Sequence, residues 1–495
     1  MAGSSNLIKV PNFSGVPKLE ELVLEGCSKI RTLDPSIGKL KNLKLLNLKK
    51  CQELTSLPNK FEWKSLVTLN LTGCSKVKKI PEFVGNMTHL QELLLEGTAI
   101  TELPSSVECL IGLTSLDLTD CKKIELLPST ICSLKSLDKI MLLGCSKFYK
   151  LPKGLGNITS LTNLDFSGTA IKELPSSIEF LNGLKVLALK DCRKFVRLPS
   201  TVCSLKSLRA MDLSRCSKFV NLPEKLGNLE HLGKLYIEGT AIEVLPSSVG
   251  HLAALVDLNL KDCKNLVCLP STICNLKRVS KFNLAGCSKI TNLPENLGNM
   301  ERLYVFSLDG TAIKELPSST IHLKREMLSF SSRGCQLSSS SLTSMPRGVY
   351  IDLSDCNLTA IPSGIDRNLT AIPRGIVRYP LRMHRNSTSL FLSGNDFDSL
   401  PDSISLFSQL RGLYLEGCKS LRSLWNVQIP STVVFLCVDN CTSLERLPER
   451  REPLPNVFSQ DFGVQCFNCF KLAENFEYLS NMFQVSLSLI SVCVF

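Results

Sequence analysis

The chain has 495 residues, of which 44% are hydrophobic and 6% aromatic, and it carries a formal net charge of +12 at pH 7. This composition suffices for a continuous core that is mainly aliphatic. Its 22 cysteines occur in a chain far longer than the small secreted domains that depend on disulfides, which argues against a disulfide framework and favours reduced thiols.

The amino terminus reads Met1-Ala2-Gly3-Ser4-Ser5, and no apolar signal-peptide core follows it. We therefore expect this protein in the cytoplasm or the nucleus. N-x-S/T sequons such as those at Asn70 and Asn157 point to the secretory pathway instead, but only weakly, because so short a pattern often arises by chance.

A repeat of 23 or 24 residues organises the chain, marked by Leu-Pro or Ile-Pro ends from Pro58 to Pro317. A longer period of 71 residues overlies it, because the sequence Gly-Thr-Ala-Ile recurs at 97–100, 168–171, 239–242 and 310–313. Each long unit is three short repeats, which indicates duplication. The sequence therefore predicts one repeat array and not several globular domains.

Each short repeat reads L-x-x-L-x-L-x-x-C-x-x-L-x-x-L-P, the spacing typical of leucine-rich repeats. The L-x-L core predicts a short strand with leucines inward and the intervening residues outward. The Pro predicts an extended or turn conformation before a helical or irregular return. About eighteen such turns predict an α/β leucine-rich-repeat solenoid, or horseshoe, with a parallel β-sheet on the concave face and an irregular or short helical convex side. At a strand spacing of about 4.8 Å, the inner face would be on the order of 85 Å long, which suits a protein partner.

The ninth position of the repeat is a small residue that we expect to turn inward, pack, and satisfy local backbone groups. It is Thr at 98, 169, 240 and 311 and Asn at 395. Elsewhere it is cysteine, at Cys27, Cys51, Cys74, Cys121, Cys145, Cys192, Cys216, Cys263, Cys287, Cys335, Cys356, Cys418 and Cys441.

The outward strand positions differ among the four Gly-Thr-Ala-Ile repeats, although the framework around them barely changes. This pattern fits either diversification for contact with a partner or drift at exposed positions that packing does not restrain. The inner face carries more acids than bases over its first thirteen turns, so the basic excess lies on flanks and loops such as Lys78 and Lys79, and a nucleic-acid partner is not expected. The candidate protein-binding residues are Glu92, Leu94, Glu96, Asp117, Met141, Asp165, Lys190, Asp212, Lys234, Tyr236, Glu238, Asp257, Lys261, Lys281 and Asp309.

The array is expected to span residues 1–448 and to be irregular at 325–390, where disorder or a kink is predicted. Ser332 replaces a buried leucine there, and the sequence 357–362 recurs at 368–373. Residues 449–495 are expected to be a truncated post-repeat segment. Its apolar end, 485–495, is too short to cross a bilayer, so no membrane span is predicted.

Catalysis has little support in the sequence. The histidines His89, His231, His251, His322 and His384 are scattered through different repeats with no Cys or carboxylate at ligand spacing. Cys466 and Cys469 form a single C-x-x-C, which is weak support for zinc or redox chemistry without a second pair. We therefore expect no enzymatic activity, no metal and no cofactor.

Several phrases together carry a family resemblance: residues 6–9 with 16–20, 22–27, 97–100 with 102–106, and 468–475. Over residues 6 to about 477 the chain resembles the leucine-rich-repeat region of plant intracellular immune receptors of the TIR-NBS-LRR class, the disease-resistance proteins. The resemblance implies a protein-recognition role in which pathogen effectors, or guarded host proteins that they modify, contact the inner face and relieve autoinhibition.

The chain departs from this family in what surrounds the repeats. It has no phosphate loop and no TIR or nucleotide-binding domain before the array, so a receptor would supply those domains in trans. Three alternatives remain open. They are an extracellular repeat protein that inhibits pathogen hydrolases, a truncated nonfunctional receptor fragment, and a repeat-containing ubiquitin ligase, which would need a large domain after the array.

Overall fold

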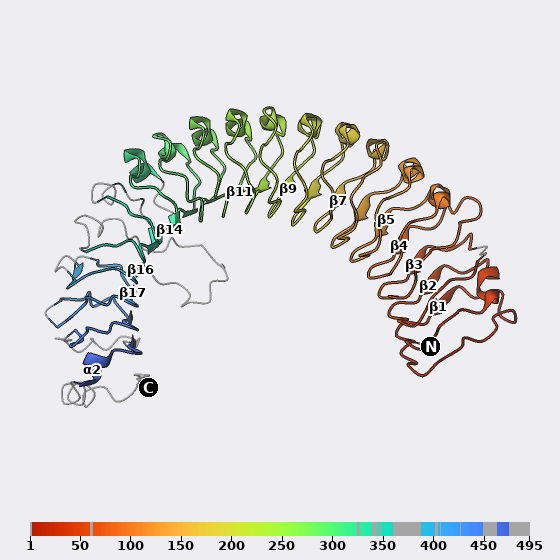
Figure 1. Ribbon diagram of the computed structural model, residues 1–495, viewed down its shortest axis with the longest axis horizontal. Helices are drawn as coiled ribbons and strands as arrows, with labels where there is room; N and C mark the ends of the chain where they lie inside the picture. The colour runs from red at the N-terminus through yellow and green to blue at the C-terminus, as the bar shows by residue number, and fades with distance from the viewer. Residues whose placement is uncertain are drawn as a thin grey trace. The chain divides into compact units, whose positions relative to one another are not determined.

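The computed structural model describes residues 2–59, 63–323, 327–338, 344, 346, 348–359, 388–400, 404–405, 407–425, 427–448 and 463–474. The chain forms two compact units, Met1–Leu255 and Val256–Phe495. Each unit is built from the same short repeat, with one strand to each turn of the chain (Figure 1).

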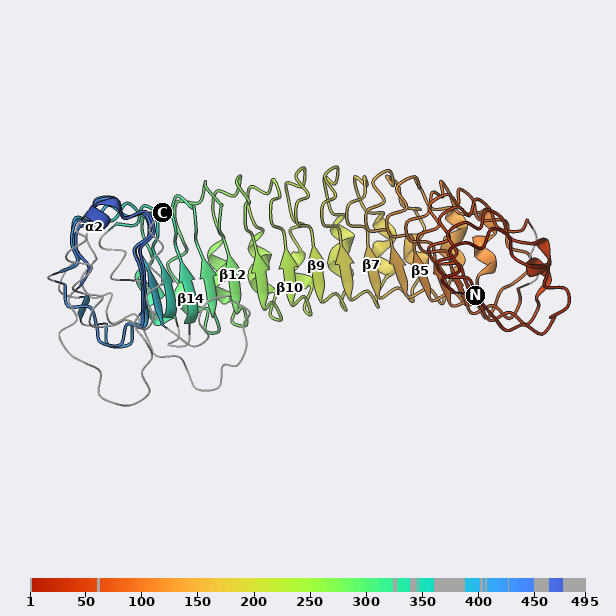
Figure 2. The ribbon, with the colours of Figure 1, turned by 90° about the horizontal axis from the view of Figure 1, so that it is seen from below.

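In the first unit, each strand has three residues and pairs in parallel with the strand of the next repeat, without a shift in register. Figure 2 shows these short strands side by side. The strands are β1 (Glu21–Val23), β2 (Leu45–Asn47), β3 (Thr68–Asn70), β4 (Glu92–Leu94), β5 (Ser115–Asp117), β6 (Lys139–Met141), β7 (Asn163–Asp165), β8 (Val186–Ala188), β9 (Ala210–Asp212) and β10 (Lys234–Tyr236).

Short 3-10 helices form the return path on the side opposite the strands (Figure 1). Pro104 precedes one of them with φ −64° and ψ 151°, the extended conformation that the Pro predicted, and its carbonyl oxygen accepts from the N–H of Val107 at 3.0 Å. The helices of the first unit are η1 (Pro35–Lys39), η2 (Ser105–Cys109), η3 (Ser129–Ser133), η4 (Leu155–Asn157), η5 (Ser176–Phe180), η6 (Ser200–Ser204), η7 (Leu226–Asn228) and η8 (Ser247–His251).

The second unit repeats this plan, again with parallel pairing between successive strands. Its strands are β11 (Asp257–Asn259), β12 (Lys281–Asn283), β13 (Val305–Ser307), β14 (Met327–Ser331), β15 (Gly348–Asp352), β16 (Ser389–Phe391), β17 (Gly412–Tyr414), β18 (Phe435–Cys437) and β19 (Gly463–Gln465). Its helices are η9 (Ser271–Asn275), η10 (Leu297–Asn299), η11 (Ser318–His322) and α2 (Phe470–Glu474).

The core of each unit consists of stacked rows of apolar side chains. The middle residue of each three-residue strand is buried, as Leu93, Leu116 and Ile140 illustrate, because alternate residues of a strand point to opposite faces. In the second unit the rings of Phe282 and Phe306 continue this row, with centroids 5.6 Å apart. No repeat buries its own apolar face alone, so the stability of each comes from its neighbours. The predicted leucine-rich-repeat solenoid is confirmed.

The residue before the ninth position turns the chain out of the strand with a positive φ. Gly97 has φ 68° and Gly168 has φ 73°, a region that glycine enters at little cost. This turn explains the glycine of the Gly-Thr-Ala-Ile motif. Where a cysteine follows, Asp120 and Asp191 adopt the same left-handed conformation.

The ninth residues form a buried ladder of side-chain hydrogen bonds. The thiol of Cys74 donates to the carbonyl oxygen of Leu48 in the preceding repeat at 3.0 Å, and the thiol of Cys145 donates to that of Leu118 at the same distance. Thr98 instead donates to Leu95 of its own repeat, at 2.8 Å. The expected role of this position in satisfying backbone groups is thus confirmed, and the described cysteines are all free thiols.

Two observations concern the predicted domain boundaries. Strand β19 pairs with β18, so the sheet extends one strand beyond residue 448, into the segment predicted to follow the repeats. Within 325–390, strands β14 and β15 pair in regular parallel register. The second copy of the tandem sequence, 368–373, lies outside the described residues.

Candidate interaction surface

The face opposite the core consists of the first and third residues of each strand, together with the residues that follow. All fifteen predicted binding residues are solvent-accessible on this inner face. Those from Glu92 to Glu238 belong to the first unit, and Asp257, Lys261, Lys281 and Asp309 belong to the second. The fold therefore divides the predicted surface into two parts, and each part is a surface of its own unit.

From β4 to β10, the third strand positions form one row across the sheet, in which acidic and apolar side chains alternate. The row runs through Leu94, Asp117, Met141, Asp165, Ala188, Asp212 and Tyr236. Because neighbouring strands lie about 4.8 Å apart, the carboxylates of this row recur roughly every 10 Å. Such a row suits a partner with regularly spaced polar groups.

The aspartates of this row also shape the turn that follows each strand. Oδ1 of Asp117 accepts from the backbone N–H of Thr119 at 2.9 Å, and Oδ1 of Asp165 accepts from that of Ser167 at 2.9 Å. Asn70 makes the same contact with Thr72, at 3.0 Å. These side chains therefore have a local structural role that the sequence analysis did not recognise, and one carboxylate oxygen of each aspartate is already engaged.

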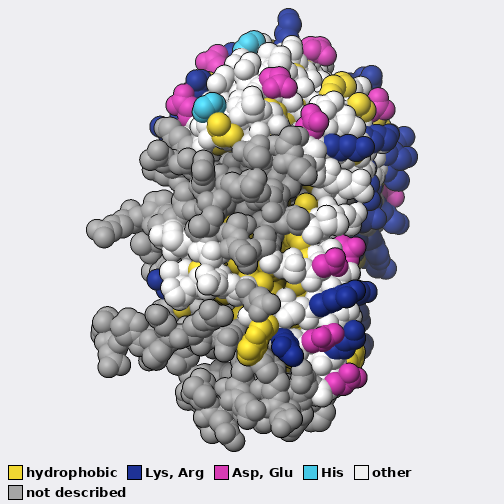
Figure 3. All heavy atoms as spheres, turned by 90° about the vertical axis from the view of Figure 1, so that its left-hand side faces the viewer, with side chains coloured by type: hydrophobic (Ala, Val, Ile, Leu, Met, Phe, Trp, Pro, Cys, Tyr) yellow, Lys and Arg dark blue, Asp and Glu magenta, His cyan; other side chains and the backbone are white. Residues whose placement is uncertain are grey.

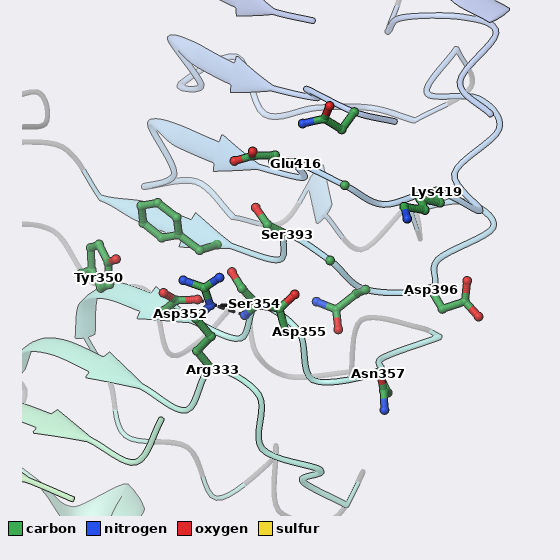
Figure 4. A pocket seen from close by; sticks show the side chains of 15 residues that line it. Arg333, Tyr350, Asp352, Ser354, Asp355, Asn357, Ser393, Asp396, Glu416 and Lys419 are labelled. Carbon is green, nitrogen blue, oxygen red and sulfur yellow. Dashed lines mark hydrogen bonds and ion pairs between the residues drawn. The ribbon is translucent and has the colours of Figure 1, made fainter. Parts of the chain in front are cut away.

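The second unit contains a hollow that the sequence analysis missed, with a volume of about 760 Å³. Figure 4 shows Arg333, Asp352 and Ser354 pointing toward one another at its edge. The lining residues are Arg333, Tyr350, Asp352, Ser354, Asp355, Asn357, Phe391, Ser393, Gly394, Asn395, Asp396, Glu416, Gly417, Lys419 and Asn440.

A stripe of four aromatic rings crosses β15 to β18 at this hollow, and we call it the aromatic stripe: Tyr350, Phe391, Tyr414 and Phe435. Successive ring centroids lie 4.5, 4.1 and 5.5 Å apart, and the rings of Phe391 and Tyr414 are stacked with an interplanar angle of 6°. All four side chains are half-buried. An aligned run of partly exposed rings on a sheet face is typical of a contact surface.

The hollow is acidic beside the aromatic stripe. Arg333 Nε lies 2.9 Å from Asp355 Oδ2, and this contact raises the pKa of the guanidinium. Asp352 is half-buried, and this burial raises the pKa of its carboxyl. The backbone N–H of Ser354 donates to Asp352 Oδ1 at 2.9 Å, which opposes the rise but does not cancel it. Burial, together with the carboxylates of Asp352 and Asp309, also raises the pKa of the Tyr350 hydroxyl. Negative charge at this end of the stripe is therefore only partly compensated.

A signal for this site existed in the sequence. Tyr350 and Phe435 occupy first strand positions, and Phe391 and Tyr414 occupy third positions, of four successive repeats. The interval between Cys356 and Asn395 is 39 residues in place of the usual 23 or 24. The repeat spacing therefore does not show which residue of β16 pairs with Asp352, and the alignment of the four aromatic residues was missed.

We call the exposed pair Lys78 and Lys79 the basic flank. Lys78 and Lys79 are exposed, and neither makes an ion pair within the described residues. Their neighbour Lys76 is paired with Glu53 at 2.6 Å. On the face shown in Figure 3, Lys and Arg side chains gather along one edge.

Within the part of the chain that the structure describes, no group of three or more His, Cys, Asp or Glu side chains is arranged to hold a metal ion. Among the same residues, no helix is long and apolar enough to span a bilayer. The thiols of Cys121 and Cys74 in the ladder are not activated, since burial raises the pKa of Cys121 to about 11 and that of Cys74 to about 12.

Comparison with known proteins relates these repeats to a particular class. A model described as a leucine-rich repeat region matches residues 57–168. A model described as the leucine-rich repeats of disease resistance proteins like RPS4B matches residues 204–293.

Two curated relatives agree with these matches. TMV resistance protein N of Nicotiana glutinosa is 36% identical over 270 residues, which cover 54% of this chain and 24% of that protein. A probable disease resistance protein of Arabidopsis thaliana is 34% identical over 325 residues, which cover 65% of this chain and 16% of that protein. The chain therefore spans less than a quarter of the length of these relatives.

A solved leucine-rich-repeat protein of Leptospira interrogans matches with a TM-score of 0.54 at 21% identity, covering 84% of this chain and 88% of that one, and this likeness shows the fold alone. The fold and its inner face thus define a leucine-rich-repeat protein. More particularly, its repeats are of the kind found in plant disease-resistance proteins, to which the chain is related.

Proposed function

We propose that this chain is the protein-recognition region of a plant intracellular immune receptor. It acts in the cytoplasm, without enzymatic activity, and its inner face contacts pathogen effectors or the host proteins that they modify. The relatives named as disease-resistance proteins support this assignment. The domains that such a receptor would add, of the TIR and nucleotide-binding kinds, act on the same chain or in trans.

One observation carries the proposal: variation is concentrated on the accessible face. In the four copies of the 71-residue unit, the middle strand residue is always buried and apolar: Leu93, Leu164, Leu235 and Phe306. The third residue of the same strands differs in each copy: Leu94, Asp165, Tyr236 and Ser307. A surface that diverges while its scaffold stays constant suits recognition of different partners. Partly exposed aromatic and apolar side chains there, such as Tyr236, favour contact over drift.

The basic flank provides the second part of the proposal, a contribution to autoinhibition. Lys78 and Lys79 offer exposed positive charge near the start of the array. We assign to this flank a docking contact with a nucleotide-binding domain, which holds the receptor inactive until a partner binds the inner face. Contacts between surface charges are weakened by salt, so such docking is reversible.

The test is co-expression in plant cells of the tagged chain with a fragment that contains TIR and nucleotide-binding domains, scored by co-purification and by cell death. We expect the chain to bind this fragment and to suppress cell death. The double reversal Lys78→Glu/Lys79→Glu is expected to weaken both effects. The matched control is Lys153→Glu/Lys225→Glu, which makes the same charge change on the helical side of the same unit.

Absence of binding, with the chain recovered instead from the extracellular fluid, would overturn the receptor assignment in favour of a secreted binder. Equal loss of binding in the control and in the flank variant would remove the flank from the mechanism, because the effect would then follow net charge alone.

A further inference from the structure

The aromatic stripe and its acidic border form a surface whose chemistry indicates one kind of occupant. The stripe crosses four strands, so it extends roughly 14 Å at the usual strand spacing of about 4.8 Å. That length exceeds a single side chain and fits about four residues of an extended peptide, at roughly 3.4 Å each. The hollow beside it, of about 760 Å³, is large enough for several side chains.

The charged side chains that line the hollow indicate which charge the occupant carries. The lining side chains include the acids Asp352, Asp355, Asp396 and Glu416 and the bases Arg333 and Lys419. Arg333 is committed to Asp355 by their 2.9 Å contact. Asp352 and Glu416 make no ion pair within the described residues, and they stand on repeats at either side of Phe391. Among the described residues, a positively charged group over the stripe would therefore meet carboxylates from two directions, and these are only partly compensated by Arg333.

The rings favour a guanidinium over an ammonium. The ring of Phe391 lies between those of Tyr350 and Tyr414, so a partner meets the edges of these rings. A planar, weakly hydrated guanidinium packs against such half-buried rings and pairs with a carboxylate through two N–H groups at once, whereas an ammonium is a compact and strongly hydrated charge. Elsewhere in the second unit a guanidinium already lies over an aromatic ring, because the guanidinium carbon of Arg446 lies 5.8 Å from the ring centroid of Trp425.

A glycine beneath the stripe leaves room for the ring of Tyr414. A Cβ at position 412 would lie 3.1 Å from Cε2 of Tyr414 and 3.0 Å from Oγ of Ser389. Because Gly412 has no side chain, Tyr414 can lie close to the strand and stack on Phe391, with centroids 4.1 Å apart. The stripe is thus held in position by the sheet beneath it.

We propose that the aromatic stripe, with Asp352 and Glu416 at its border, binds an extended, arginine-containing segment of a partner protein. An arginine side chain packs against the exposed edges of Tyr414 and Phe391 and pairs with Glu416, and the segment runs across β15 to β18. This inference rests on the proposed recognition function and names the chemistry of the partner that the second unit selects.

The experiment uses the full chain and three fluorescein-labelled peptides of twelve residues, in which serine alternates with arginine, lysine or glutamate. Fluorescence anisotropy at low salt measures the three dissociation constants. We expect the arginine peptide to bind several-fold more tightly than the lysine peptide, and the glutamate peptide to show no saturable binding. Binding of the arginine peptide is expected to weaken as salt is raised.

Variants locate the binding on the chain. Tyr414→Ala and Glu416→Gln are each expected to weaken the arginine peptide about tenfold, whereas Tyr414→Phe keeps the ring and retains binding. Asp165→Asn is the matched control, because it removes an inner-face acid of the first unit and preserves the turn contact. Circular dichroism melts of every variant show whether the repeats remain folded.

Three results would overturn the inference: equal binding of the arginine and glutamate peptides, wild-type affinity in folded Tyr414→Ala and Glu416→Gln, or equal weakening in Asp165→Asn. Such a failure is distinguishable from failure of the receptor proposal, because the co-expression assay with the TIR and nucleotide-binding fragment does not involve the stripe.

Discussion

The side chain of Asn395 holds the backbone of Leu358, whose N–H donates to Asn395 Oδ1 at 2.9 Å, although 37 positions separate the two residues. The same oxygen accepts from the N–H of Cys356 at 3.1 Å. The amide nitrogen donates to the carbonyl oxygens of Leu353 and Leu392, at 3.0 and 2.8 Å. Asn395 is buried, so one side chain satisfies four backbone groups and joins two repeats across the longest interval in the array.

Replacement of Asn395 should therefore be among the most costly single changes at the ninth position. Asn395→Ala leaves two buried N–H groups without this acceptor, and each costs about 1–3 kcal/mol. We expect the second unit to lose about 2–4 kcal/mol of unfolding free energy, as measured by urea denaturation. Cys418→Ala is the matched control in the next repeat and should cost less, because it removes a single weak contact, to Leu392 at 3.4 Å. A smaller loss for Asn395→Ala than for the control would contradict this assignment.

The cysteine ladder should make stability fall at alkaline pH. Burial raises the pKa of Cys51 and Cys121 to about 11 and that of Cys74 to about 12. The pKa of a thiol in the unfolded chain is about 8.5, so the native state binds more protons above that pH. The stabilising contribution is complete below about pH 8.5 and is lost as the pH rises toward 11 or 12.

Thermal melts between pH 7 and pH 10.5 measure this loss, and the midpoint should fall above about pH 8.5. The triple variant Cys51→Ser/Cys74→Ser/Cys121→Ser removes three of the titrating groups, and its midpoint should depend less steeply on pH. The thiol contribution would be refuted if the variant and the wild type had the same slope.

Ser332 is a position at which the natural sequence is not optimal for stability. Its hydroxyl is buried without a hydrogen-bond partner within the described residues, and it aligns with Leu308 and Leu353 in the neighbouring repeats. Ser332→Leu should stabilise the second unit by about 1–2 kcal/mol, because it buries apolar surface and removes an unsatisfied hydroxyl. Urea denaturation measures the gain. Ser332→Ala, which removes only the hydroxyl, should give a smaller one, and a destabilised leucine variant would mean that neighbouring side chains already fill the space.

Two substitutions of Asp165 should distinguish the contribution of its turn contact to stability from that of its negative charge. Asp165→Ala removes the contact to the N–H of Ser167 and should cost about 1 kcal/mol of unfolding free energy. Asp165→Asn keeps an acceptor oxygen in place, as Asn47 does toward the N–H of Lys49 at 3.0 Å, and should leave stability nearly unchanged. Thermal denaturation of both variants distinguishes them, and equal losses would show that the charge and not the turn contact matters for stability.

Much of the fold could be predicted from the sequence because the residues that form the strand, the return and the turn of each repeat lie within that repeat. Alternation around Leu93 and Leu116 sets the strand, Pro104 sets the return, and the ninth residue closes the turn. The structure also gave Asp117 and Asp165 a turn contact that inspection of charge alone did not suggest. The sheet continues to β19, beyond the predicted end of the array at residue 448. Strand pairing requires only the free edge of β18 and a short segment with an apolar middle residue, and β19 provides that segment.

The sequence by itself determined that this chain is an array of leucine-rich repeats with a constant core and a variable face, because those features repeat locally every 23 or 24 residues. Only the tertiary structure decided which side chains meet on that face. The aromatic stripe exists because Asp352 pairs with Phe391 and Phe391 pairs with Tyr414 across β15, β16 and β17. Register across an interval of 39 residues depends on strand pairing and on the contacts of Asn395, which no local pattern encodes.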